Sequence, residues 1–265
     1  MRVLYFANNR VGWQIGRWLR EQGEEIVGLV LHPPKRRRFS AEILEAVPLA
    51  QERIFDGSRL REASVVAELG ALRPELGVSA LFGYLIPPEV LALFPCGCIN
   101  LHPAYLPYNR GAYPNVWSIV DRTPAGVTIH FVDDGIDTGD VVAQRRVDVE
   151  PADTGETLYR RLEEASVALF RETWPLIRSK RALRTPQEPN AGTFHRVGDV
   201  ERIDEIDLDR SYNARFLLDV LRARTFGSFP GTYFRDGARK IYVTVRLRES
   251  EEPEGQLKSG SSHEV

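Results

Sequence analysis

Apolar residues in the first part of the chain fall into short, nearly continuous runs, a pattern typical of strands that are buried on both faces. Such runs cover residues 2–7, 25–31, 76–82 and 96–102. Between the first two runs, over residues 11–19, apolar positions recur at helical spacing. The alternation of strand and helix predicts an α/β fold: a Rossmann-like, mostly parallel sheet with helices on both faces.

Two further strands and a long helix are predicted later in the chain. Residues 126–132 alternate between apolar and polar, and residues 141–149 are expected to return beside them as an antiparallel strand. The sequence Asp153-Thr154-Gly155-Glu156 has the form of a capping box, which predicts the start of a long helix. Before these elements, Ser58 is expected to cap a helix that continues through Leu72.

A break in the apolar pattern between positions 181 and 198 predicts a boundary between two structural units. We expect residues 1–185 to form the larger, Rossmann-like domain and residues 190–248 to form a small α+β subdomain. Residues 249–265 are polar and are expected to form a disordered tail.

The small subdomain has a helical pattern near residues 210–223 and two short strands joined by Asp236-Gly237, which is a hairpin signal. An isolated hairpin has unpaired edges, and this one also carries apolar side chains. These are Tyr233, Phe234, Ile241, Tyr242 and Val243. The combination predicts a homodimer formed partly by the hairpin.

The composition excludes several classes of protein. Apolar residues make up 43% of the chain, and 35 Lys and Arg against 37 Asp and Glu give a formal charge of -2, so no basic field attracts nucleic acid. No apolar stretch approaches membrane-spanning length and no signal-peptide cleavage region is found, so a cytoplasmic location is expected. Cys96 and Cys98 have a poor spacing for a mutual disulfide and are expected to be small core residues.

Candidate chemistry lies at the end of the predicted strand 96–102. Apolar and polar residues alternate there, so Asn100 and His102 are expected on the same side of the strand. Pro103 keeps the backbone of His102 extended, and the strand then ends at a carboxyl edge, where open α/β sheets bind ligands. His130 lies inside the next strand and is expected to be a satisfied core or supporting histidine, not a catalytic one.

An acidic, glycine-rich turn follows residues 126–132 and supplies a carboxylate to orient the imidazole. An asparagine can donate a hydrogen bond to a developing oxyanion, a histidine can move a proton, and an aspartate can stabilise imidazolium. This set suits acyl transfer to an amine, with His102 acting either as a base or, when protonated, as an oxyanion donor. The His and Asp residues show no complete metal-ligand spacing, so no metal is expected.

The order and spacing of several motifs closely resemble those of the 10-formyltetrahydrofolate-dependent formyltransferases over roughly residues 1–180. The motifs are Asn100-Leu101-His102-Pro103, Leu106-Pro107, Arg110-Gly111, Gly126-Val127-Thr128-Ile129-His130, Asp137-Thr138-Gly139-Asp140 and Gln144. The resemblance implies transfer of a formyl group from the folate to a primary amine, with Asn100, His102 and Asp137 at the catalytic positions.

The resemblance also implies where the two substrates bind. The loop after the fourth strand would receive the folate, and the expected cofactor-binding residues are Phe82, Gly83, Tyr84, Ile86, Asp133 and Asp134. The polar turn after the first strand lies at the same sheet edge, where backbone N–H groups at a helix start can hold an anion. The expected acceptor-binding residues are Asn8, Asn9, Arg10, Tyr108, Asn109, Arg110, Tyr113 and Asn115.

Within the family, the stretches 108–117, 193–196 and 229–231 resemble the sugar-nucleotide N-formyltransferases. The implied acceptor is an amino deoxysugar linked to a nucleotide such as dTDP or GDP. The alternatives are a methionyl-tRNA formyltransferase, a purine-pathway formyltransferase, or a catalytically silent nucleotide- or folate-binding module. A tRNA acceptor is disfavoured because residues 199–248 carry only a slight basic excess and are few for the larger barrel of the tRNA enzymes.

Overall fold

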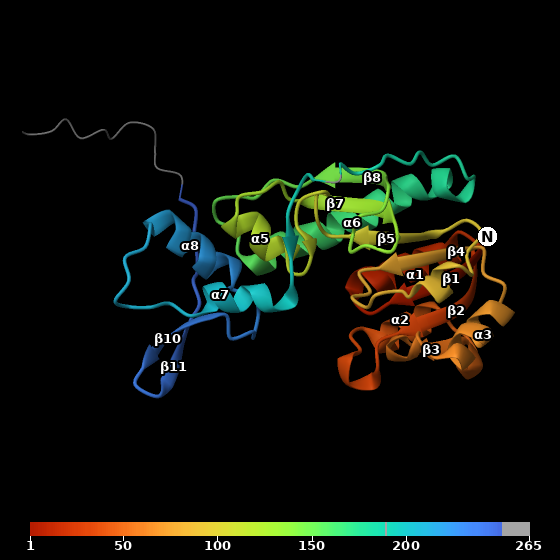
Figure 1. Cartoon of the computed structure of the whole chain (residues 1–265), viewed down its shortest axis with the longest axis horizontal. Helices are drawn as coiled ribbons and strands as arrows, with labels where there is room; N and C mark the ends of the chain where they lie inside the picture. Colours follow the sequence, from red (N-terminus) through yellow and green to blue (C-terminus); the bar gives the residue numbers. More distant parts are fainter. Residues whose placement is uncertain (189, 251–265) are drawn as a thin grey trace, which may run out of the picture.

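A seven-stranded sheet forms the centre of the larger part of the computed structural model (Figure 1). In spatial order its strands are β3 (Ile54–Asp56), β2 (Glu25–Leu31), β1 (Arg2–Ala7), β4 (Leu76–Ala80), β5 (Cys98–His102), β7 (Gly126–Phe131) and β8 (Val141–Arg146). The first five are parallel, whereas β7 and β8 are antiparallel to their neighbours. The structure describes residues 1–188 and 190–250, and no helix in these ranges is long and apolar enough to cross a membrane.

Helices cover both faces of the sheet, because the side chains of its strands alternate between two hydrophobic cores. In β1, Val3 and Tyr5 belong to one core, and Leu4 and Phe6 belong to the other. The first core is closed by α1 (Arg10–Glu21), α2 (Ser40–Ala46), α5 (Pro114–Val120) and α6 (Gly155–Arg178), and the second by α3 (Ala63–Ala71) and α4 (Pro88–Leu91). The predicted Rossmann-like, mostly parallel architecture is confirmed.

Local hydrogen bonds decide where two of the helices begin. The long helix α6 begins where it was predicted, but its capping box is formed by Thr154 and Thr157, one residue later than the predicted pattern of Asp153 to Glu156. The prediction that Ser58 caps a helix is wrong, since Ser58 lies in a 3-10 turn and donates both its N–H and its hydroxyl to Asp56 Oδ1. Helix α3 therefore begins later, at Ala63.

The carboxyl-terminal unit contains α7 (Glu201–Asp204), α8 (Ala214–Ala223) and an antiparallel hairpin of β10 (Thr232–Asp236) and β11 (Arg239–Val243). The helix and the hairpin agree with the prediction. Helix α8 packs beside α5, and Arg122 Nη2 lies 2.6 Å from Asp219 Oδ2 between them. The hairpin projects away from the main sheet (Figure 1). Most of the predicted disordered tail lies outside the described residues.

The chain between the two units packs against the sheet edge and is not a free linker. Thr185 forms a bridge with Val141, and β9 (Phe194–His195) pairs in parallel with β6 (Arg110–Gly111). Gly111 has a φ of +87°, and a Cβ there would lie 2.3 Å from the carbonyl oxygen of His195, so only glycine permits this approach. The domain boundaries at 185 and 190 stay predictions.

Candidate active site

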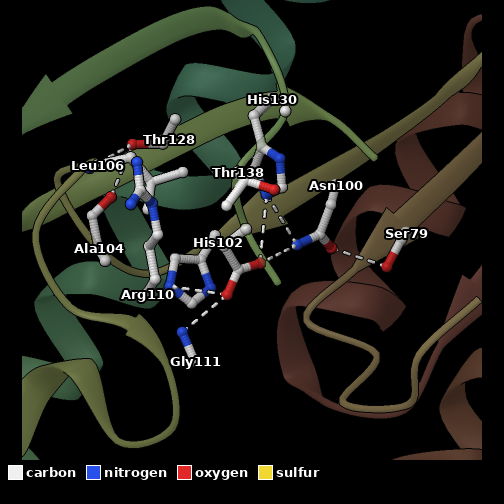
Figure 2. A network of polar contacts seen from close by, with 12 residues as sticks. Ser79, Asn100, His102, Ala104, Leu106, Arg110, Gly111, Thr128, His130 and Thr138 are labelled. Atoms are coloured by element: carbon white, nitrogen blue, oxygen red, sulfur yellow. Dashed lines mark hydrogen bonds and ion pairs between the residues drawn. The ribbon is translucent and has the colours of Figure 1, made fainter. Parts of the chain in front are cut away.

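Strand register places three polar side chains in one row across the sheet. Ser79 of β4 lies opposite Asn100 of β5, and Asn100 lies opposite His130 of β7. Because paired residues project from the same face of a sheet, their side chains meet without any contribution from loops. Figure 2 shows Asn100, His102 and His130 turned toward a common centre, with Ser79 beside the amide of Asn100.

The amide of Asn100 is held in one orientation by its neighbours. Ser79 Oγ donates to Asn100 Oδ1 at 2.8 Å, so Nδ2 is directed to the opposite side. Asn100 Nδ2 lies 3.2 Å from His130 Nε2 and 3.5 Å from Asp137 Oδ1. The N–H groups of the amide therefore point to the centre of the cluster, as an oxyanion donor must.

His102 is buried, and its protonated nitrogen can be assigned from its acceptor. Nε2 lies 3.1 Å from the carbonyl oxygen of Asn109 and 3.6 Å from Asp137 Oδ2, so Nε2 carries the hydrogen and donates. The lone pair of the neutral ring is then on Nδ1. Burial lowers the pKa of His102 below its ordinary value, although the charge of Asp137 acts in the opposite direction. The imidazole is therefore neutral near pH 7 and able to accept a proton.

Asp137 completes the cluster from the acidic turn. Its Oδ2 accepts the backbone N–H of Gly111 at 2.9 Å, and its Oδ1 lies 3.4 Å from His130 Nε2. Burial acts to raise the pKa of the Asp137 carboxyl, but His102, His130 and the Gly111 N–H together lower it below its ordinary range. The structure thus brings together the three predicted catalytic residues, with Asp137 ionised between two imidazoles.

The loop that follows His102 is fixed by a second network (Figure 2). Thr128 Oγ1 donates to the carbonyl of Ala104 at 2.7 Å and accepts the N–H of Leu106 at 3.2 Å. Gln144 Nε2 donates to the carbonyl of Leu106 at 2.7 Å. These bonds hold the turn after β5 against β7 and β8, which fixes the position of His102.

A cavity of about 600 Å³ opens above this cluster. One part of its wall is the loop between β4 and α4, and another is formed by residues 111–114 and 194–197. The predicted site residues in its lining are Asn9, Phe82, Gly83, Tyr84, Ile86, Asn100, His102, Tyr113, Asp133 and Asp137. Predicted cofactor, acceptor and catalytic residues thus share one cavity.

Three predicted acceptor ligands, Asn109, Arg110 and Asn115, use their side chains on partners within the protein and do not line this cavity. Asn109 is fully buried, and its amide donates to Ser118 and Thr123. Asn115 donates to the carbonyl of Gly155, and Arg110 donates to Gln187. Asn109 instead contributes its backbone, because its carbonyl accepts a hydrogen bond from the ring Nε2–H of His102.

Four other predicted ligands, Asn8, Arg10, Tyr108 and Asp134, also lie outside the lining of this cavity. Asn8 Oδ1 accepts the N–H of Arg38, and Arg10 is the first residue of α1. Asn9 does line the cavity, but it also caps α1 by accepting the N–H of Gly12 at 3.0 Å. Substrate contacts by these residues stay predictions.

Several residues of the site were not predicted as contacts. Ser79 and His130 have no distinctive local motif and become recognisable only through the register of β4, β5 and β7. His195 stacks on Trp117 with ring centroids 4.2 Å apart, and its Nε2 lies 3.3 Å from Asp121 Oδ2. The only signal for His195 was the likeness of residues 193–196 to one branch of the family.

A second, larger groove of about 860 Å³ lies between the α5–β7 connection and α8. Asp219 in its wall accepts from Arg122 at 2.6 Å and from Arg222 at 2.8 Å. None of the clustered residues Asn100, His102 and Asp137 lines this groove. The smaller cavity is therefore the candidate active site.

The chain also matches known families. Residues 5–173 match the formyl transferase family, and residues 199–249 match the N-formyltransferase dimerization C-terminal domain. A methionyl-tRNA formyltransferase from Geotalea daltonii is 28% identical over 97% of this chain and 83% of its own length. A dTDP-4-amino-4,6-dideoxyglucose formyltransferase from Mycobacterium tuberculosis is 37% identical over 59% of this chain and 66% of its own length.

Solved structures of similar proteins include a 4-N formyltransferase from Francisella tularensis, with a TM-score of 0.77 and 26% identity over 94% of this chain and 98% of that one. Another is a formyltransferase from Anoxybacillus kamchatkensis in complex with UDP-4,6-dideoxy-4-formamido-L-AltNAc and tetrahydrofolate. Its TM-score is 0.55, and it is 31% identical over 76% of this chain and 89% of that one. Since the family match spans more than half of the chain and includes Asn100, His102 and Asp137, the chain belongs to the formyl transferase family.

Proposed function

We propose that this protein moves a formyl group from 10-formyltetrahydrofolate to the amino group of a nucleotide-linked amino deoxysugar. The observation that carries the proposal is the single cavity that contains the β4–α4 loop, the aromatic residues at Tyr113 and Phe194, and the cluster of Asn100 and His102. One cavity with two distinct walls suits two substrates that must meet at the reacting groups.

The β4–α4 loop has the properties needed to hold the folate, which supplies the formyl group when bound. Phe82 and Ile86 are buried and give the wall an apolar character. Gly83 lines the cavity with a φ of +75° and no side chain, so a ligand can approach the backbone closely at this position. An apolar slot with accessible backbone groups suits a flat heterocycle with polar edges.

The wall formed by residues 111–114 and 194–197 suits a sugar nucleotide. Tyr113 and Phe194 are 41% and 44% exposed, so both rings are available to stack on a nucleobase. Arg196 lines the same part of the cavity and can pair with a phosphate. The solved relative from Anoxybacillus holds both a UDP-linked formamido sugar and tetrahydrofolate, which supports a site that takes a sugar nucleotide together with a folate.

The geometry of the cluster indicates how the transfer proceeds. The acceptor amine attacks the formyl carbon while Asn100 Nδ2 donates to the oxygen that becomes negative. His102 takes the proton from the amine as the new C–N bond forms, and Asp137 stabilises the resulting imidazolium. The bond between the formyl carbon and the folate nitrogen then breaks, and that nitrogen receives the proton.

We expect amino sugars, and not methionyl-tRNA, to be formylated when both are offered with the same donor. The panel is dTDP-, GDP- and UDP-linked amino sugars and charged initiator tRNA, with formyl addition followed by mass and release of tetrahydrofolate by absorbance. The His102→Asn variant serves as the control for uncatalysed formylation. Turnover of the tRNA with none of the sugars used would reject the proposed acceptor.

The alternative of a methionyl-tRNA formyltransferase has a specific observation in its favour. The relative from Geotalea matches 97% of the chain. Against it, the carboxyl-terminal unit matches the N-formyltransferase dimerization domain, and the chain carries a formal charge of -2, which gives a polyanion no overall attraction. We therefore favour the sugar nucleotide.

A homodimer through the β10–β11 hairpin is part of the proposal, and light scattering at micromolar concentration is expected to give twice the mass of the chain. Ile241 and Tyr242 on the hairpin are 38% and 49% exposed, and burying them would favour association. Tyr242→Asp is expected to shift the equilibrium toward the monomer. A wild-type monomer at this concentration would reject the dimer.

A further inference from the structure

The backbone of the acidic turn is held by a glutamine from the chain segment that connects the two units. Gln187 Nε2 donates to the carbonyl of Asp137 at 2.9 Å and to the carbonyl of Gly139 at 2.8 Å. The two hydrogens of one amide group are thus both used on the turn that contains Asp137. The distance along the chain is large, so the contact depends on the tertiary fold.

Arg110 fixes the orientation of this amide. Its Nε and Nη2 donate to Gln187 Oε1 at 3.2 and 2.8 Å, and its Nη1 donates to the carbonyl of Ala191 at 3.4 Å. Since the guanidinium can only donate, the oxygen of Gln187 must face it, and the NH₂ group must face the turn. The arginine expected to bind the acceptor therefore has another role here.

The turn needs such support. Asp137 has a φ of +55°, a left-handed conformation that residues other than glycine adopt uncommonly and that the surrounding contacts stabilise here. In this conformation its carboxylate reaches the Gly111 N–H, His102 and His130. Without the two bonds from Gln187, the carbonyls of Asp137 and Gly139 lose these donors, while the bonds of Gly135 and Thr138 to Asp133 remain.

We infer that Gln187, oriented by Arg110, is a positioning residue that holds the carboxylate of Asp137 against the two imidazoles. The inference rests on the proposed function because the turnover that is measured is formyl transfer. Gln187 does not line the cavity, so it acts through Asp137 and not on a substrate. A displacement of the carboxylate by about 1 Å would lower the rate by up to roughly 10²-fold.

Two substitutions test the inference, with a matched control in the same segment. Gln187→Met keeps the length of the side chain and removes the amide, whereas Gln187→Glu keeps the pairing with Arg110 and replaces the donor by an acceptor. Arg184→Met is the control, because Arg184 Nε contacts Asp140 Oδ2 of the same turn at 3.0 Å but does not contact Asp137. All three are compared with the wild type for unfolding by denaturant.

Both Gln187 variants are expected to lower kcat by roughly 10- to 10²-fold with nearly unchanged KM for donor and acceptor, whereas Arg184→Met keeps the wild-type kcat. The ¹⁵N resonances of the His102 ring in the free protein give a readout without turnover, and the same two variants are expected to shift them. Wild-type kcat and unshifted resonances in Gln187→Met would overturn the inference. If the wild type formylates no amine, the proposed function fails, and the His102 resonances alone decide the role of Gln187.

Discussion

Asn100→Ala is expected to lower kcat by roughly 10²- to 10³-fold, which is the usual effect of removing one donor from an oxyanion site. The hydroxyl of Ser79 orients the amide so that Nδ2 is directed to the cluster. His102→Asn is expected to lower kcat by roughly 10²- to 10⁴-fold, because the amide that replaces the imidazole cannot accept the proton of the amine. Steady-state kinetics with a productive amino sugar measure both effects.

Folding has to be preserved for this result to be informative. Both residues lie on β5 and line the cavity, so neither substitution empties the hydrophobic core. Denaturant unfolding and the fraction of dimer should match the wild type. A folded Asn100→Ala variant with the wild-type rate would remove the amide from the mechanism, and the same outcome for His102→Asn would leave the proton transfer without an assigned residue.

Ser79→Ala would keep the Asn100 amide as a donor and remove the hydrogen bond that orients it. The hydroxyl holds Asn100 Oδ1 at 2.8 Å, and without it the amide can rotate. We therefore attach the catalytic role to Asn100 and a supporting role to Ser79. The two roles differ in how the sequence reveals them, since Asn100 belongs to a recognisable motif and Ser79 does not.

Local pattern predicted the parts of the site that depend on one strand or one turn. Alternation along β5 correctly placed Asn100 and His102 on one side, because side-chain direction in a strand follows from its period of two. Ser79 and His130 join them only through the pairing of β4, β5 and β7, and that register is a property of the whole sheet. His130 was expected to be a core or supporting residue, and the structure places it 3.4 Å from Asp137.

For the polar residues after β5, residue type led to a wrong expectation about which side chains face the cavity. Asn109, Arg110 and Asn115 have the chemistry of nucleotide ligands, yet each satisfies an interior partner. Polar side chains that are buried by the fold must find hydrogen bonds, and the sequence does not indicate which ones will be buried. A local hydrogen bond also explains why α3 begins later than predicted, since the N–H and the hydroxyl of Ser58 both donate to Asp56.

The pH dependence of kcat/KM is expected to report the effect of Asp137 on the pKa of His102. Burial keeps the pKa of His102 below its ordinary value, and the charge of Asp137 raises it part of the way back. Because neutral His102 accepts the proton, kcat/KM of the wild type should rise with pH through this pKa and reach a plateau near neutrality. Asp140→Asn, on the same turn but outside the lining of the cavity, should leave the profile unchanged.

Asp137→Asn is expected to lower the plateau by roughly 10²-fold or more, because the amide cannot stabilise the imidazolium that forms during transfer. It should also move the acid limb of kcat/KM to lower pH. The sign follows from the charge: removing the carboxylate removes the contribution that raises the pKa of His102, so burial lowers this pKa further. Profiles of the wild type, Asp137→Asn and Asp140→Asn measured with one amino sugar check both effects. An acid limb that moves to higher pH, or a plateau equal to that of the wild type, would contradict the assignment of His102 as the base and Asp137 as its partner.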